Sequence, residues 1–200
     1  MKNVLISTLL ALACAAIQAQ APASPTQRLR GSVESFDGST LVVKERSGEV
    51  LRLALADNFS VSEVLPIALS SIQTGSYIGT AAATDERGNL TALEVLVFPE
   101  AARGTGEGHG PWDLQPGSTM TNATVSEMVV AAGGRTMKLR YKDGEKTIVV
   151  PEGIPIVTLK PGDRSLLVPG AKVLVTAQTR DGKPTALRAA VGRDGFTPPM

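Results

Sequence analysis

The sequence predicts an all-β chain of two tandem small β-barrels with five to six antiparallel strands each, or a β-sandwich in place of either barrel. The first observation is an internal repeat, because the pattern of residues 33–50 returns 96 residues later at 129–146. The second is that short apolar runs alternate with Gly, Asp and Asn turn residues, and the third is the lack of any long helical periodicity. The repeat assigns residues 30–99 to the first module and residues 121–195 to the second.

The chain begins with a predicted secretory signal peptide, residues 1–19. Lys2 precedes a short apolar run, and small residues follow as far as Ala19, where we expect cleavage. The apolar run is too short to span a bilayer as a helix, and no later stretch is longer, so we expect no transmembrane segment. The alternative is a lipid anchor at Cys14, because residues 11–14 resemble a bacterial lipoprotein box. The expected location is therefore bacterial, periplasmic or secreted, with a lipoprotein as the alternative.

Composition then narrows the classes of function. Cys14 is the only cysteine, so cleavage after Ala19 leaves a chain without thiols or disulfides. Cleavage also removes Lys2, which brings the formal charge from +1 to zero. A neutral chain with few aromatic residues has no general attraction for nucleic acid, and none is expected as a partner. Residues 20–29 are rich in Pro, Ala, Ser and Gln and are expected to form a disordered tether.

Each module is expected to consist of hairpins. In the second module, Met137, Leu139 and Tyr141 alternate with charged residues, which indicates a half-buried strand. The turn that follows contains Asp143-Gly144, a pair suited to a type I′ turn. The strands expected in chain order are 41–46, 50–55, 76–84 and 93–98 in the first module, and 137–142, 146–150, 171–179 and 187–191 in the second.

The turn and core residues of the modules resemble a bacterial secreted domain, DUF5666. The matching residues in the first module are Gly31, Val33, Asp37, Gly38, Thr40, Leu41, Val43, Gly75 and Ala92. The second module matches less well, because Gly133 replaces the turn aspartate and 161–163 are added. The resemblance implies two tandem copies of a barrel similar to the OB fold, and it implies no activity. Secreted proteins of this kind sometimes carry a metal-transport label.

The connector, residues 100–120, differs from the rest of the chain. It is rich in glycine and contains the only histidine and the only tryptophan, His109 and Trp112. One interpretation is a metal or small-ligand loop formed by Glu107, His109 and Asp113, with Arg103 beside them, although one imidazole and some carboxylates make a weak transition-metal site. The favoured alternative is that Trp112 docks between the two modules, which are small and gain from a shared interface. Either way, the candidate ligand-binding residues are Arg103, Glu107, His109, Trp112 and Asp113.

The function predicted from these observations is that of a non-enzymatic binding or adaptor protein of the cell envelope. No cofactor motif is present, so no cofactor is expected, and the partner is expected to be another envelope protein or a small ligand. An accessory metal-handling protein that uses His109 is the alternative. A hydrolase ranks last, since a single histidine among unpatterned serines does not suit a Ser/His/Asp site. Residues 196–200 are expected to be a short tail.

Overall fold

The structure is a computed structural model that describes residues 25–86, 88–131 and 134–199, so the predicted signal peptide and Cys14 lie outside the described residues. Its strands, in chain order, are β1 (Gln27–Phe36), β2 (Thr40–Glu45), β3 (Val50–Pro66), β4 (Tyr77–Thr84), β5 (Leu90–Val97), β6 (Gly108–Pro111), β7 (Thr119–Ala131), β8 (Gly134–Tyr141), β9 (Gly144–Pro151), β10 (Ile156–Gly162), β11 (Lys172–Arg180) and β12 (Lys183–Gly192). The helical turns are all short 3₁₀ segments: η1 (Leu69–Ser71), η2 (Glu100–Ala102), η3 (Arg164–Leu166) and η4 (Arg193–Gly195).

The prediction of an all-β chain is confirmed. Within the described ranges, none of the helices has the length and apolar character needed to cross a bilayer.

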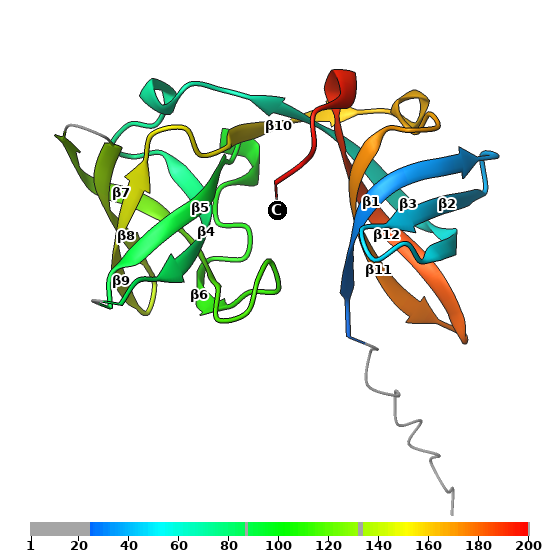
Figure 1. The fold of residues 1–200 in the computed structure, drawn as a ribbon, viewed down its shortest axis with the longest axis horizontal. Helices are drawn as coiled ribbons and strands as arrows, with labels where there is room; N and C mark the ends of the chain where they lie inside the picture. The colour runs from blue at the N-terminus through cyan, green and yellow to red at the C-terminus, as the bar shows by residue number, and fades with distance from the viewer. Residues whose placement is uncertain (1–24, 87, 132–133, 200) are drawn as a thin grey trace, which may run out of the picture.

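Two rings of strands lie side by side (Figure 1). In barrel 1, the strands follow the order β12-β11-β1-β2-β3, and β3 pairs with β12 to close the ring. In barrel 2, they follow the order β5-β4-β7-β8-β9, and β9 pairs with β5. The short strand β6 lies on β7 outside this ring.

The strand pairing does not follow the two contiguous modules predicted from the repeat. Barrel 1 combines β1, β2 and β3 of the first repeat with β11 and β12 of the second, and barrel 2 combines β4 and β5 with β7, β8 and β9. The reason lies in the repeat itself, because equivalent strands of the two copies can complete a ring in either combination. The ranges 30–99 and 121–195 are therefore not the two barrels. Barrel 2 is a continuous segment inserted between the two halves of barrel 1.

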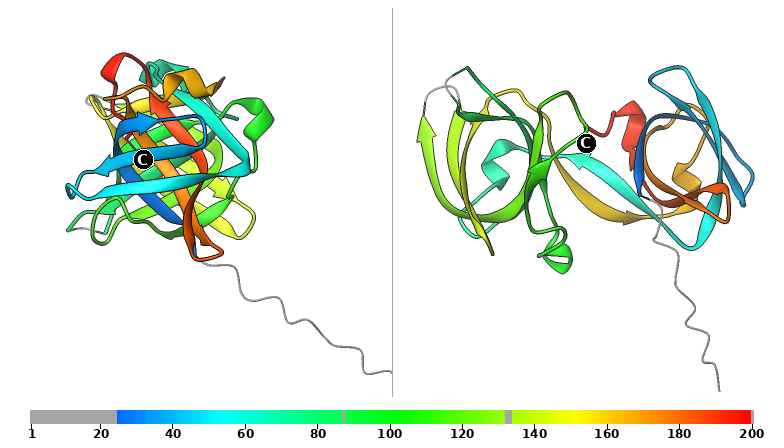
Figure 2. Two further views of the ribbon diagram at one scale, coloured as in Figure 1. Left: turned by 90° about the vertical axis from the view of Figure 1, so that its right-hand side faces the viewer. Right: turned by 90° about the horizontal axis from the view of Figure 1, so that it is seen from below.

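Strands β3 and β10 join the barrels. The long strand β3 pairs with β2 over its first residues, with β12 farther on, and with β10 at its end. Strand β10 also pairs in parallel with β5 of barrel 2, so one sheet continues from barrel to barrel. The views in Figure 2 show this strand pair crossing between the two rings. Strand β10 corresponds in the second repeat to the last residues of β3 in the first. Two equivalent segments therefore pair with each other, in an antiparallel and symmetric ladder.

Three apolar clusters match this arrangement. Barrel 1 is filled by a core that includes Leu41 and Leu53, and barrel 2 by a core that includes Met137, Leu139 and Ile148. The sequence prediction that Met137 and Leu139 face a core is confirmed, since both are fully buried. A third cluster lies where the barrels meet and contains Val64, Leu96 and Val157, with Phe98, Leu159, Leu174, Ala190 and Phe196 packed against it.

Several predicted boundaries and one turn are corrected by the structure. The expected tether 20–29 overlaps β1, which begins at Gln27, because β11 offers residues 27–32 a pairing partner. The start of the expected tail 196–200 is anchored, since Phe196 packs in the cluster between the barrels. The type I′ prediction at Asp143-Gly144 is wrong, because Gly144 already belongs to β9 and Asp143 does not have a positive φ. That turn type occurs instead at Asp181-Gly182, with φ values of 48° and 73°.

Candidate functional site

The connector is ordered along its whole length and follows barrel 2 before it reaches toward barrel 1. After the 3₁₀ turn η2, it adds β6 to the edge of β7, with His109 opposite Thr121 and Pro111 opposite Thr119. The backbone of Gly104, Gly106 and Gly108 has positive φ, which glycine adopts without the cost other residues carry. This local chain path separates the candidate residues into three places.

Arg103 and Glu107 each have a structural partner. The Arg103 guanidinium binds the Glu100 carboxylate, with its Nε 2.5 Å from Oε1, and its Nη2 donates to the carbonyl of Gly75. The Glu107 carboxylate accepts a hydrogen bond of 3.0 Å from the backbone N–H of Lys142. Both side chains therefore hold the connector against barrel 2.

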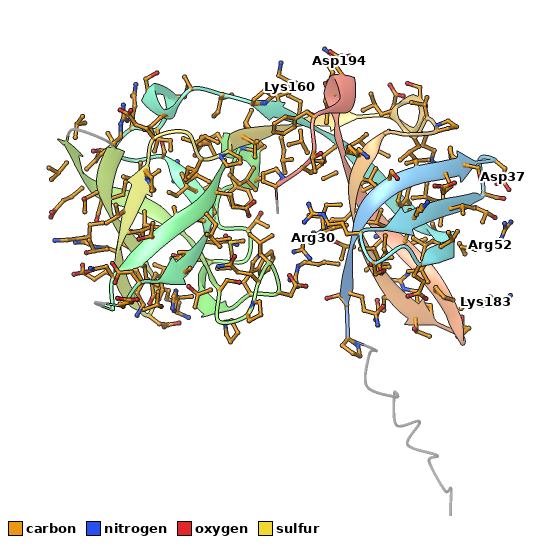
Figure 3. All side chains as sticks on the ribbon, in the orientation of Figure 1. Arg30, Asp37, Arg52, Lys160, Lys183 and Asp194 are labelled. Atoms are coloured by element: carbon orange, nitrogen blue, oxygen red, sulfur yellow. The ribbon has the colours of Figure 1, made fainter. Side chains whose placement is uncertain are left out.

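Trp112 and Asp113 contact β1 of barrel 1. The guanidinium carbon of Arg28 lies 3.8 Å from the centroid of the Trp112 ring, which is a cation–π contact. Asp113 binds Arg30 at 2.8 Å and Arg28 at 3.4 Å through its two carboxylate oxygens. Figure 3 shows Arg30 on the side of β1 that faces barrel 2. We call these four residues the latch, since they join the connector of barrel 2 to β1.

The geometry does not gather a metal site from the predicted ligands. Glu107 binds the backbone of Lys142, Asp113 binds two arginines of barrel 1, and His109 binds Thr121. In the described part of the chain, no group of three or more His, Asp or Glu side chains is arranged to hold a metal ion. The glycines between these residues let the chain turn, and each turn sends the next side chain to a different neighbour.

A pocket of about 430 Å³ lies at one mouth of barrel 2, beside β6. We call it the mouth pocket; it is lined by Thr84, Gly88, Asn89, Leu90, His109, Thr119, Lys146, Thr147 and Val149. The labelled strands β6 and β9, which contribute to its lining, lie at the lower part of the left-hand barrel in Figure 1. Two of its walls, β5 and β9, pair only between Leu90 and Ile148 and between Thr91 and Val149, so the ring is barely closed there.

His109 is the only one of the predicted site residues that lines the mouth pocket. Its Nδ1 lies 2.8 Å from the hydroxyl of Thr121, which is fully buried, so the imidazole is held by one nitrogen and can offer Nε2 to a ligand. Burial lowers the pKa of His109, and the nearby Lys146 ammonium lowers it further. The ring is therefore neutral near pH 7.

Sequence reasoning missed Glu94, the most deeply buried acid among the described residues. Its side chain is 1% exposed on β5, and neither carboxylate oxygen has a hydrogen-bond partner in the part of the chain that the structure describes. Burial raises the pKa of Glu94 to about 7, although Arg30 and Arg46 of barrel 1 act in the opposite direction. The only signal in the sequence is an acid within the apolar run 92–98.

The site therefore has two parts, the mouth pocket with His109 and the contact between the barrels with the latch and Glu94. The connector supplies His109, Trp112 and Asp113 and has no counterpart in the other repeat, whereas Lys146 and Glu94 lie on the barrel strands β9 and β5. The resemblance to DUF5666 stays a prediction. No protein-family model, curated protein or solved structure matches this chain.

Proposed function

We propose that this chain is a non-enzymatic binding protein of the bacterial cell envelope that holds a small polar ligand in the mouth pocket of barrel 2. The observation that carries the proposal is the position and lining of that pocket. Small-molecule sites in β-barrel proteins commonly lie at a barrel mouth and combine apolar side chains with a few polar groups. Here the lining combines Leu90 and Val149 with the polar side chains of His109, Lys146 and three threonines.

The equivalent mouth of barrel 1 supports this assignment by contrast. Val43 pairs with Leu51 there, as Leu139 pairs with Lys146 in barrel 2. The turn between β8 and β9 is shorter than the turn between β2 and β3, so strand pairing makes Lys146 the equivalent of Leu51, one residue away from the 96-residue offset of the sequence repeat. Leu51 packs against the core of barrel 1, whereas Lys146 lines the pocket. An apolar side chain closes barrel 1 at this position. A partly buried lysine at the same position of barrel 2 costs free energy, which contacts with a bound ligand would offset.

The cell-envelope part of the proposal rests on the predicted signal peptide, and the non-enzymatic part on the absence of a catalytic pattern in the sequence. A metal-handling function has no comparable support, because Glu107, His109 and Asp113 bind different partners. An adaptor function that uses a protein partner would need a surface other than this pocket.

The test is a thermal-shift and titration screen of small polar metabolites, both charged and neutral, against the chain from residue 20 onward. At least one compound is expected to raise the melting temperature of the native protein and to lose its effect in Thr147→Trp, which fills the pocket. Thr179→Trp is the matched control, because Thr179 is an exposed strand residue of barrel 1. Binding that persists in Thr147→Trp, or no binding by any compound, would contradict the proposal.

A further inference from the structure

We infer that the ligand of the mouth pocket carries an oxyanion group, a carboxylate or a phosphate, which Lys146 and His109 bind from two sides. This inference rests on the proposed function and specifies the chemical class of the ligand. It follows from the charges of the lining residues, from the hydrogen-bond donors that remain available, and from a comparison with a second pocket of the molecule.

The charge of the mouth pocket has one sign. Lys146 and His109 are its ionisable lining residues among those the structure describes, and the other described lining residues are uncharged. No acidic side chain of the described chain lies within ion-pair distance of the Lys146 ammonium. Lys146 is half-buried, and a lysine in a pocket whose described lining has no acid is a favourable partner for an anionic ligand.

The strand register explains why Lys146 lies at this place. Along β9, Ile148 and Val150 are fully buried in the core of barrel 2, and Lys146 is the preceding residue on that face. Its backbone pairs with Leu139 of β8, which is also buried. The backbone of Lys146 is therefore fixed by the ladder of the barrel, and its side chain starts on the face of β9 that carries the buried Ile148 and Val150.

Several hydrogen-bond donors surround the same space. The His109 ring can donate from Nε2 when Nδ1 accepts from the Thr121 hydroxyl. The Thr119 hydroxyl is buried and has no hydrogen-bond partner among the described residues, so a ligand oxygen would satisfy it once the side chain turns toward the pocket. Thr147 adds a further hydroxyl to the lining. Oxyanions accept several such bonds at once, whereas a cation would find no acidic ligand in this described lining.

A pocket on barrel 1 provides an internal comparison. It has nearly the same volume, about 420 Å³, and is lined by Lys44, Arg46 and Lys172 together with Glu34 and Glu45 and with Gly31, Ser32 and Thr197. The two acids there can each pair with a base, so that lining offers its lysines and arginine acidic neighbours within the pocket. The described lining of the mouth pocket contains no acid, so Lys146 has no carboxylate beside it in that pocket.

The binding of an oxyanion should strengthen as the pH falls below 7. The groups that face His109 are the Lys146 ammonium from β9, which disfavours an imidazolium ion, and the uncharged Thr121 hydroxyl from β7. A bound anion would supply the opposite charge that the imidazolium ion lacks. By linkage, protonation of His109 and binding of the anion then favour each other.

The experiment is calorimetric titration with inorganic phosphate, with citrate, with glucose as a neutral probe, and with sulfate, whose charge does not change between pH 6 and pH 8. We expect the three anions to bind, sulfate to bind more tightly at pH 6 than at pH 8, and Lys146→Met to weaken the anions about tenfold or more. Lys172→Met is the matched control, because it removes a lysine from the pocket of barrel 1 and should leave the affinity unchanged. His109→Asn, which retains a side-chain partner for Thr121, should remove most of the difference between the two pH values.

The outcomes separate this inference from the proposed function. If glucose or another neutral compound binds and is blocked by Thr147→Trp while phosphate and citrate do not bind, the oxyanion inference is wrong and the proposed function stands. Anion binding that is equally strong in Lys146→Met, with circular dichroism showing a folded variant, also overturns the inference. If neither charged nor neutral compounds bind to the native protein, both are wrong.

Discussion

The two barrels follow one five-strand plan but close differently. In barrel 1, β12 pairs with β3 from Thr185 to Gly192, with one irregularity, and the equivalent seam of barrel 2 joins β5 to β9 at only two residue pairs. The mouth position is a leucine in barrel 1 and a lysine in barrel 2. The comparison teaches that two rings with one strand order can differ in how far their closing strands pair, and the proposed ligand pocket lies at the less fully paired seam.

A second difference lies in continuity along the chain. Barrel 2 is formed by one uninterrupted segment, whereas barrel 1 depends on two segments that barrel 2 holds together. If barrel 2 unfolded, the halves of barrel 1 would be linked by a flexible loop of roughly 100 residues, and closing such a loop costs about 4 kcal/mol. That cost is a large part of the stability of an ordinary domain.

The largest expected effect comes from equivalent core substitutions in the two barrels. Leu53→Ala in barrel 1 and Ile148→Ala in barrel 2 should each lower the free energy of unfolding by about 2–5 kcal/mol, since both side chains are fully buried. Ile148→Ala should unfold both barrels together, while Leu53→Ala should populate a state in which barrel 2 alone is folded. Denaturation followed by circular dichroism and by Trp112 fluorescence would distinguish these cases. Identical two-state transitions in both variants would show that barrel 2 does not stay folded without barrel 1.

The next effect concerns equivalent positions on the faces of β5 and β12. Glu94 is buried between the barrels with a pKa of about 7, and its counterpart in the other repeat, Arg188, is exposed. Because the folded-state pKa lies above the ordinary value of 4.5, Glu94 stabilises the fold fully below pH 4.5, and this contribution is lost as the pH rises through 7. The loss amounts to roughly 3 kcal/mol.

Glu94→Gln should therefore remove this part of the pH dependence and be more stable than the native protein at pH 8. Urea denaturation between pH 5 and pH 8 measures the difference in free energy of unfolding between the native protein and Glu94→Gln. The contribution of His109 cancels from this difference because both proteins contain that residue. Arg188→Gln is the matched control and should leave the pH profile unchanged. A native profile that Glu94→Gln does not alter would mean that Glu94 does not titrate in this range.

The smallest effect is expected at the latch. Trp112→Ala removes the contact with Arg28 and should lower the free energy of unfolding by about 1 kcal/mol, with a fall in melting temperature of roughly 2–4 °C. Trp112→Phe keeps an aromatic ring over the guanidinium and should recover part of the loss. An unchanged melting temperature, together with unchanged resistance to protease, would show that the latch does not hold the barrels together.

Local sequence patterns were sufficient to predict most strands but not their partners. The alternation around Met137 and the turn residues at 142–145 define the hairpin of β8 and β9. Strand β10 was missed, since its residues show no clear alternation and its pairing with β3 is a long-range contact between the repeats. The exchange of strands was unpredictable for the same reason, because a repeat makes two partners nearly equivalent and local propensity cannot choose between them.

The candidate site shows the same limit. His109 and Trp112 were found because they are unique residues in an unusual segment, and both have defined contacts in the structure. The role of Lys146 depends on which face of β9 is turned inward, and the burial of Glu94 depends on the neighbouring barrel. Both are consequences of tertiary arrangement and carry no distinctive sequence signal.

The nesting of barrel 2 within barrel 1 has a consequence for the order in which the chain can fold as it is synthesised. The strands β1, β2 and β3 are made first, yet β11 and β12, which complete their ring, are made last. Barrel 2 can close as soon as β9 has emerged, while the first three strands still have unpaired edges. Such edges favour association with other chains, so the growing protein is most vulnerable between the synthesis of β3 and that of β12.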